Sequence, residues 1–159
     1  MTPRHPTARV ISVNISSGGI PRRPVGQVFV SRNGLFGDGR SHACHIKPSR
    51  AVSLLDERVI LALQTEGYVV GAGTMGENLT VRGLDVDHMK VNTCLRFTGG
   101  VEIELTERRV PCLLLDSIDP TLKTAVLGRF GFMARVITEG HLRRGAAVEV
   151  ISEVSSQAM

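Results

Sequence analysis

Short apolar runs separated by glycine-bearing turns are the feature of this sequence that most restricts its fold. The pattern is clearest where Val101, Ile103 and Leu105 alternate with polar residues. A period of two places successive side chains on opposite faces of a β-strand. Further runs that predict strands lie at residues 11–15, 25–30, 51–55, 79–81, 134–138 and 147–151. We therefore expect a mostly β fold with a few short helices, closed into a β-barrel or a strongly coiled sheet, because closure removes exposed strand edges.

The first predicted strand has an apolar and a polar side. Ile11, Val13 and Ile15 alternate with Ser12 and Asn14. Such a strand is expected to be half-buried, with its apolar side chains inside and its polar ones at the surface.

Two segments with a different spacing predict helices. Asp56 can cap a helix that runs to about Glu66 and stops at Gly67. The apolar face of this helix would comprise Val59, Ile60 and Leu63. A shorter helix is predicted over Asp119–Leu127, with Pro120 in its first turn.

Length and composition indicate one folded domain. The 159 residues suffice for a single core, and 42% hydrophobic with 21% charged residues argues against disorder. We expect an N-terminal extension at residues 1–9, the domain at 10–151 and a frayed tail at 152–159. With one Tyr, five Phe and no Trp, the core must consist mainly of Val, Ile and Leu, and stacking of nucleic-acid bases on aromatic rings is not expected.

The formal net charge of +4 favours anionic partners. The basic residues are scattered, with pairs only at Arg22-Arg23, Arg108-Arg109 and Arg143-Arg144. Each pair is also explained by a solvated strand end or turn. A scattered pattern fits a small anionic ligand better than a nucleic acid.

The sequence predicts a soluble, cytoplasmic protein. No signal peptide is visible at the start, and no apolar run approaches the roughly 20 residues that cross a bilayer. The three cysteines, Cys44, Cys94 and Cys112, are an odd number at irregular spacing, which indicates a reducing compartment rather than a disulfide framework. Cys94 falls in a predicted strand and is expected in the core.

Cys112 lies where the regular pattern ends. The apolar phase of the preceding strand is lost at Glu107, and Arg108 and Arg109 follow. Pro111 then cannot donate a hydrogen bond to a sheet, so the chain should leave the sheet there. Positive neighbours increase the fraction of a thiol that is thiolate, the form that attacks sulfur and binds metals. We therefore expect Cys112 to carry the chemistry; the alternative is a small buried residue that only packs.

Two glycine-bearing segments are further candidates for a binding site. Residues 37–39, Gly-Asp-Gly, can direct amides and a carboxylate into a pocket, with a plain polar loop as the alternative. Gly71–Asn78 contains three more glycines, and its last two residues directly precede a strand that could fix them. A mobile surface loop is the alternative for this segment.

The segment His42-Ala43-Cys44-His45 contains zinc-ligand side chains. A structural zinc site needs a second pair of ligands, and the other histidines show no paired spacing. We therefore do not predict a zinc site.

Taken in order, several segments resemble a MOSC domain, the C-terminal domain family of molybdenum cofactor sulfurases. The matching segments are Gly37-Asp38, Arg50–Leu55, Gly76–Val81, Arg109–Cys112, Gly128–Gly131 and Gly140–Gly145. The resemblance spans about Val10 to Ile151 and is strongest where Gly-Glu-Asn-Leu-Thr is followed by Arg-x-Pro-Cys. It implies a stand-alone MOSC protein with a β-barrel of the MOSC or pyruvate-kinase-domain-like type and the cysteine at a pocket.

The resemblance also implies the site. Cys112 would hold a persulfide or ligate molybdenum. The residues that would bind the cofactor are Asp38, Arg40, Arg50, Glu77, Asn78, Arg109 and Arg129. The cofactor would be molybdopterin, the molybdenum cofactor, bound transiently or lost on purification. No pyridoxal phosphate is expected, because the aminotransferase-like domain of the fused sulfurases has no counterpart here.

Three functions follow from these expectations. The first is a molybdenum-cofactor-associated sulfur carrier or cofactor-binding domain that acts through Cys112. The second is a molybdopterin-dependent reductase of N-hydroxylated compounds with an external electron donor. The third is a non-catalytic interaction barrel, motivated by departures from the family pattern at Lys47 and Ala146. The partners would be a cysteine desulfurase, a molybdoenzyme or a reductase, with no membrane and no nucleic acid.

Overall fold

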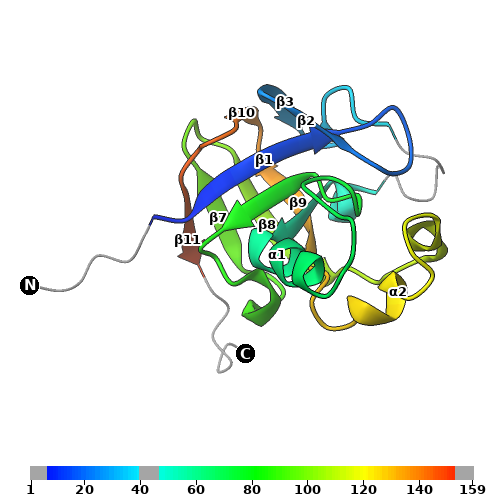
Figure 1. Ribbon diagram of the computed structural model, residues 1–159. Coiled ribbons are helices and arrows are strands. Elements are labelled where there is room, and N and C mark those ends of the chain that lie inside the picture. The colour runs from blue at the N-terminus through cyan, green and yellow to red at the C-terminus, as the bar shows by residue number, and fades with distance from the viewer. Residues whose placement is uncertain (1–6, 40–46, 153–159) are drawn as a thin grey trace, which may run out of the picture.

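The computed structural model describes residues 7–39 and 47–152, which form a mostly β fold (Figure 1). The strands are β1 (Arg9–Ile15), β2 (Arg23–Val25), β3 (Gln27–Ser31), β4 (Gly34–Leu35), β5 (Val52–Asp56), β6 (Leu79–Arg82), β7 (Cys94–Phe97), β8 (Glu102–Arg108), β9 (Phe132–Thr138), β10 (Gly140–Arg143) and β11 (Val148–Ser152). The α-helices are α1 (Glu57–Thr65) and α2 (Leu122–Ala125), and the 3-10 turns are η2 (Pro48–Arg50), η3 (Val86–His88) and η4 (Leu113–Ser117). The predicted fold class, mostly β with a few short helices, is confirmed.

Eight strands form one curved sheet in the order β11-β7-β8-β9-β5-β6-β1-β2, and β10-β3-β4 form a second, smaller sheet. Pairing is antiparallel except between β5 and β6, which are parallel and are connected through α1. Near the ends of the large sheet, β1 contacts the start of β11 through one isolated bridge, Arg9–Ala147. The backbone N–H of Val10 also donates to Ala146 O at 2.9 Å. The sheet therefore coils almost onto itself without a continuous closing ladder.

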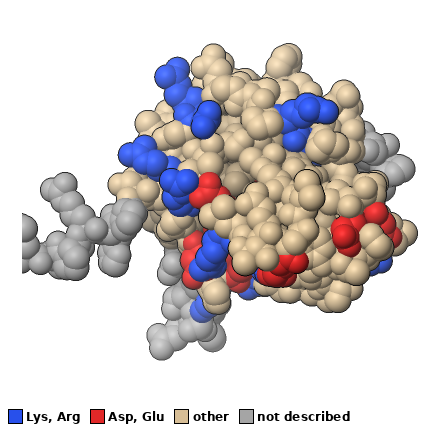
Figure 2. All heavy atoms as spheres, in the orientation of Figure 1, with Lys and Arg blue, Asp and Glu red and all other residues tan. Residues whose placement is uncertain are grey.

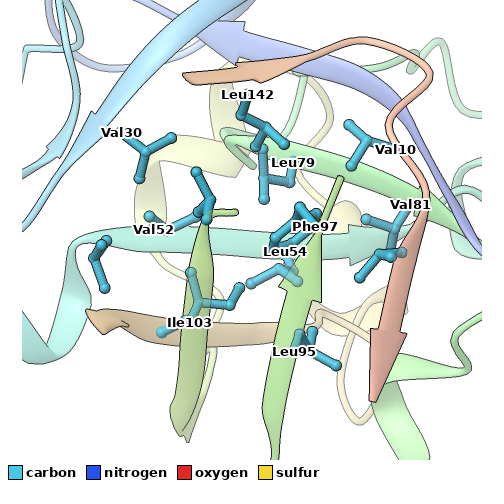
Figure 3. Close-up of a cluster of buried hydrophobic side chains, with 14 of the residues drawn as sticks. Val10, Val30, Val52, Leu54, Leu79, Val81, Leu95, Phe97, Ile103 and Leu142 are labelled. Atoms are coloured by element: carbon cyan, nitrogen blue, oxygen red, sulfur yellow. The ribbon is translucent and has the colours of Figure 1, made fainter. Parts of the chain in front are cut away.

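Two apolar cores lie side by side in this fold. The larger core fills the space enclosed by the sheets, where side chains from β1, β3, β5 to β8 and β10 converge (Figure 3). Aliphatic residues dominate it, as the scarcity of aromatics predicts. The smaller core packs α1 against η4 and α2 and includes Leu55, Leu63 and Leu115. Because Leu55 belongs to β5, the smaller core joins the large sheet to the helical segments.

The expected orientation of β1 is only partly correct. Val13 lies in the larger core and Ile15 packs against it, as predicted, but the polar side of the strand is not at the surface. Ser12 and Asn14 are buried, with exposed fractions of 5% and 0%, whereas Ile11 and Ile15 are only partly buried. The polar side chains are satisfied inside: Ser12 Oγ donates to Asn14 Oδ1 at 2.6 Å, and Asn14 Nδ2 donates to Thr80 Oγ1 at 3.2 Å. A register shift in the pairing with β6 lies between Val10 and Ser12.

The helix after Asp56 forms as predicted, with Val59, Ile60 and Leu63 buried. Asp56 itself does not cap it by a side-chain hydrogen bond; its Oδ2 accepts the Val86 N–H at 2.8 Å instead. The second predicted helix is limited to α2, because Asp119 Oδ1 accepts the Thr121 N–H and holds the preceding residues in a turn. Within the described residues, no helix combines the length and the apolar character needed to cross a membrane.

Ion pairs neutralise seven of the fourteen arginines in the part of the chain that the structure describes. The arginines paired with a carboxylate are Arg22, Arg50, Arg58, Arg82, Arg96, Arg129 and Arg135. On the face drawn in Figure 2, Lys and Arg side chains lie in separate groups with uncharged surface between them. This agrees with the scattered basic pattern of the sequence.

Replacing Asp56 by Asn is expected to make the stability less dependent on pH. Burial, followed by the charge of Asp87, raises the pKa of Asp56 to about 6. A pKa raised above that of the unfolded chain gives stability that is fully present below about pH 4 and is lost as the pH rises through about 6. At pH 8, Asp56→Asn should therefore raise the free energy of unfolding by up to about 3 kcal/mol relative to wild type. Urea unfolding at pH 4.5, 6 and 8 measures this.

The pKa of Glu77 is also raised by burial, so this residue too makes the protein less stable as the pH rises. Glu77 is present in both wild type and Asp56→Asn, and its effect cancels when the two are compared. The Asn side chain can still accept the Val86 N–H. If wild type and Asp56→Asn lose stability equally between pH 4.5 and pH 8, the assignment of the pH dependence to Asp56 is wrong.

Candidate functional site

A cavity of about 360 Å³ opens beside the smaller core, whose residues Met75, Leu115 and Phe130 contribute to its lining. Its volume lies within the range of about 300–1,000 Å³ that is typical of small-molecule sites. Three chain segments surround it: the loop at Gly19-Ile20, the loop at Met75–Asn78, and the stretch from the end of β8 into η4. The lining residues that matter for the chemistry are Arg22, Arg50, Ser53, Arg109, Cys112 and Phe130.

Cys112 lies at the mouth of this cavity and is exposed to solvent. β8 ends at Arg108, and Cys112 follows Pro111 and directly precedes η4. The chain therefore leaves the sheet after Arg109, two residues before the proline at which this was predicted. Val110 and Leu114, which line the cavity on either side of the thiol in the chain, are 78% and 48% exposed, so the rim of the cavity is apolar and open. The thiol can be reached from solution and from the cavity.

Arg109 places a guanidinium within the cavity wall. Its Nη2 donates to Met75 O at 3.0 Å, its Nη1 donates to Phe130 O at 3.4 Å, and the group lies 3.9 Å from the centroid of the Phe130 ring. Burial is the main reason that the pKa of Arg109 falls to about 10, and the charge of nearby Arg22 acts in the same direction. The charges of Glu77 and Cys112 act in the opposite direction. Arg109 thus stays protonated at neutral pH and supplies positive charge close to the thiol.

Arg108 turns away from Arg109, although the two are neighbours in the chain. Its Nη1 donates to Asp87 O at 2.8 Å, and its guanidinium lies 4.8 Å from the Phe132 ring. The backbone N–H of Arg109 donates to Gly131 O at 3.0 Å, which continues the sheet by one residue. Both arginines line the cavity, but the strand alternation sends the guanidinium of Arg108 to η3 and that of Arg109 to the loop at Met75.

Asp38 is buried in a network that shapes the cavity wall. Its carboxylate accepts hydrogen bonds from Arg22 Nε at 2.8 Å and from Arg22 Nη2 at 3.0 Å, which together form a bidentate pair. It also accepts the Ser16 N–H at 2.9 Å and Asn78 Nδ2 at 3.2 Å. Arg22 donates further to Gly76 O. The side chain of Asp38 is only 1% exposed, so the interactions described here hold it in place behind Arg22.

Asn78 joins three strands behind the cavity. Its Oδ1 accepts the Ser53 N–H at 3.1 Å, and its Nδ2 donates to Asn14 O at 3.3 Å. Its own N–H donates to Ser53 Oγ at 2.9 Å. Asn78 therefore cross-links β5 and β1 just before β6 begins, and it contributes to the lining from a fixed position.

Glu77 points away from the cavity and is fully buried. Its Oε2 accepts the Gly73 N–H at 2.9 Å and Thr80 Oγ1 at 2.7 Å. Its Oε1 has no hydrogen-bond partner among the described residues. Burial raises the pKa of this carboxyl, against the opposing effects of the two hydrogen bonds and of the Arg109 charge.

The remaining predicted site residues fall in different places. Arg50 lines the cavity from the end of η2 and pairs with Glu107. Arg129 does not line the cavity; its guanidinium pairs with Glu66 at 2.7 and 2.8 Å. Arg40 lies outside the described residues, as do His42, Cys44 and His45.

Cys94 was expected in the core, but the structure places it outside. It is half-buried at the start of β7, with Sγ 3.7 Å from Asn92 O. No group of three or more His, Cys, Asp or Glu side chains in residues 7–39 and 47–152 is arranged to hold a metal ion.

Sequence reasoning missed several residues of the site. Arg22 pairs with Asp38, which is 16 positions further along the chain. Its neighbour Arg23 is exposed, and in the sequence the dipeptide Arg22-Arg23 is also explained by a solvated strand end. The preceding Gly18-Gly19-Ile20-Pro21 cluster is a turn signal that could have indicated a fixed loop at the site. Phe130 and Met75 carry no distinctive local signal, because any buried apolar residue can have the same sequence context.

Comparison with known proteins places this geometry in a wider group. The model of the MOSC domain family matches residues 41–149. YflK of Bacillus subtilis is 29% identical over 141 residues, which cover 84% of this chain and 63% of YflK. A protein named "Reductase" from Gibberella moniliformis is 27% identical over 139 residues, which cover 79% of this chain and 24% of that protein. The chain thus spans less than two thirds of the length of either relative.

A solved structure shows the same fold. The crystal structure of YiiM from Escherichia coli matches with a TM-score of 0.76 and 23% sequence identity, covering 95% of this chain and 73% of YiiM. The family model covers more than half of the chain, including β5 to β10 and the Cys112 segment. This chain, with its coiled β-sheet and its cysteine at the mouth of a cavity, therefore belongs to the MOSC domain family.

Proposed function

We propose that this protein is a molybdenum-cofactor-associated sulfur carrier in which Cys112 holds a sulfur atom as a persulfide. The observation that carries the proposal is the exposed Cys112 thiol at the mouth of a 360 Å³ cavity with the Arg109 guanidinium in its wall. MOSC domains are associated with the molybdenum cofactor, and a thiolate is the nucleophile of sulfur exchange.

The sulfur step needs only groups on this chain and a sulfur donor. The Cys112 thiolate attacks the outer sulfur of a donor persulfide, R–S–SH. A new sulfur–sulfur bond forms to Cys112, the donor's sulfur–sulfur bond breaks, and R–S⁻ leaves, so no external oxidant or reductant is required. Arg109 supplies positive charge for the anionic sulfur. The open rim lets a protein donor, such as a cysteine desulfurase, approach the thiol.

The residues present fit the molybdenum cofactor in chemical type. A soft thiol suits molybdenum, and a guanidinium suits an anionic group of the pterin. Cys112 and Arg109 are the residues that would hold it, with Asn78 and Arg50 in the lining and Asp38 fixing Arg22 behind them. When bound, the cofactor would supply molybdenum redox chemistry at the cavity.

The test is sulfur loading followed by intact-mass measurement under non-reducing conditions. Wild type exposed to a low-molecular-weight persulfide should gain one sulfur atom, which peptide mapping should assign to Cys112. Cys112→Ala should lose this gain, whereas Cys94→Ala, which changes a cysteine outside the cavity lining, should keep it. Equal loading of wild type and Cys112→Ala would contradict the proposal.

A second candidate is a molybdopterin-dependent reductase of N-hydroxylated compounds. The similarity to the protein named "Reductase" favours it, although this chain corresponds to 24% of that protein. Cofactor-loaded protein supplied with an external electron donor should then turn over such a substrate. Absence of turnover would exclude this candidate. If in addition Cys112 resists labelling by a maleimide near neutral pH, the non-catalytic interaction barrel becomes the better account.

A further inference from the structure

Charge is balanced unevenly among the four arginines that line the cavity. Arg108 donates to the backbone carbonyls of Asp87 and Met89, outside the loop at Met75. Arg22 is paired with Asp38 and Arg50 with Glu107. No described carboxylate accepts a hydrogen bond from Arg109. Its guanidinium donates instead to the backbone carbonyls of Phe130 and Met75. A carbonyl dipole satisfies an N–H group but does not cancel a full positive charge.

Glu77 is the carboxyl that could cancel this charge, and its surroundings disfavour ionisation. The side chain is fully buried, and both of its donors, the Gly73 N–H and Thr80 Oγ1, contact the same oxygen. The other oxygen, Oε1, has no donor among the described residues. A full negative charge on a buried carboxylate with one unsatisfied oxygen is costly, and a proton on that oxygen removes the charge.

The position of Glu77 links it to the cavity through one loop. The loop from Gly73 to Asn78 has the Glu77 carboxyl on its buried side, bonded back to the Gly73 N–H. On its other side, the carbonyls of Met75 and Gly76 accept hydrogen bonds from Arg109 and Arg22. The carboxyl therefore braces the loop that holds both guanidiniums, without lining the cavity itself.

We infer that Glu77 is a positioning residue held in its protonated form, so that Arg109 keeps an uncompensated positive charge and anchors an anionic group of the ligand. This inference rests on the proposed function only in taking the cavity as the ligand site. The groups that face the Glu77 carboxyl are the Gly73 N–H of its own loop, Thr80 of β6 and, by its charge, Arg109 at the end of β8. Burial also raises the pKa of Glu77, which agrees with a protonated carboxyl.

Sulfate is the probe, because its charge is constant across neutral pH and it does not react with a thiol. Binding is followed by NMR of the backbone amides of Arg109, Val110 and Cys112 and of the Arg109 side chain, at constant ionic strength. Wild type and Glu77→Gln, which keeps the shape of the side chain without a charge, should bind sulfate with affinities within about twofold at pH 7. Arg109→Met should weaken binding by about tenfold or more, and Arg143→Met on β10, outside the cavity lining, should not.

The carbon-13 resonance of the Glu77 carboxyl reports its protonation directly in wild type, even if Glu77→Gln fails to fold. A protonated carboxyl at pH 7 supports the inference. A carboxylate signal at pH 7, clearly tighter sulfate binding by Glu77→Gln, or no sulfate binding at all would overturn it. Measuring persulfide loading and sulfate binding on the same wild-type protein separates the two proposals: sulfate binding without persulfide loading of Cys112 would refute the sulfur carrier and leave the role of Glu77 intact.

Discussion

Asp38→Ala is expected to lower the free energy of unfolding by about 3–5 kcal/mol, the range seen when one partner of a buried ion pair is removed. Asp38 is 1% exposed and Arg22 is 15% exposed in their side chains, so the remaining guanidinium would be left largely buried without its carboxylate. The Ser16 N–H and Asn78 Nδ2 would lose their acceptor as well. Urea unfolding at pH 7 measures the change, and the cavity should lose its fixed wall along with the stability.

Two controls identify the cause of this loss. Glu57→Ala breaks the pair with Arg82, whose side chain is 64% exposed, and should cost no more than about 1 kcal/mol. The double variant Arg22→Met/Asp38→Ala leaves no unpaired charge and should recover part of the loss. If Asp38→Ala costs no more than Glu57→Ala, the buried network does not stabilise the protein as described.

Gly131→Ala is expected to lower the free energy of unfolding by more than about 4 kcal/mol or to prevent folding. Gly131 has a φ of +81°, and a Cβ there would lie 1.8 Å from Leu54 O on β5. The backbone of β5 would have to move. Because the Gly131 carbonyl accepts the Arg109 N–H, the displacement would reach the cavity. The measurement is urea unfolding, with sulfur loading of Cys112 as the functional readout.

Gly128→Ala is the matched control. Gly128 has nearly the same φ, +79°, but a Cβ there meets no atom within 4 Å. Its cost is limited to the left-handed backbone conformation, about 1–2 kcal/mol. Similar losses for the two variants would show that backbone conformation, and not the contact with β5, determines the need for glycine at 131.

The sequence correctly predicted those strands and helices whose side chains follow a regular periodicity along the chain. β8 follows from strict alternation at Val101, Ile103 and Leu105, and α1 follows from its apolar face. β1 departs from this regularity because Asn14, which accepts from Ser12, donates to Glu77 O and Thr80 Oγ1, both more than 60 positions away. Burial of polar side chains that is satisfied by such distant partners leaves no trace in a local pattern.

The same distinction applies to the site. Cys112 could be predicted because proline lies beside it near the end of the strand, a local signal. The pairing of Arg22 with Asp38 and that of Arg129 with Glu66 depend on which segments the fold brings together. Resemblance to a family assigned Glu77 to cofactor binding, but only the coordinates show that its carboxyl lies behind the loop.

The opposite directions of Arg108 and Arg109 make the cavity sensitive to strand length. Since side chains alternate along β8, deleting or inserting one residue between Ile103 and Arg108 would exchange the two arginines. Arg108 would then face the loop at Met75, while Arg109 would face η3 and the phase of Cys112 would be reversed. The number of residues in this strand is therefore as much a part of the site as the identity of its arginines.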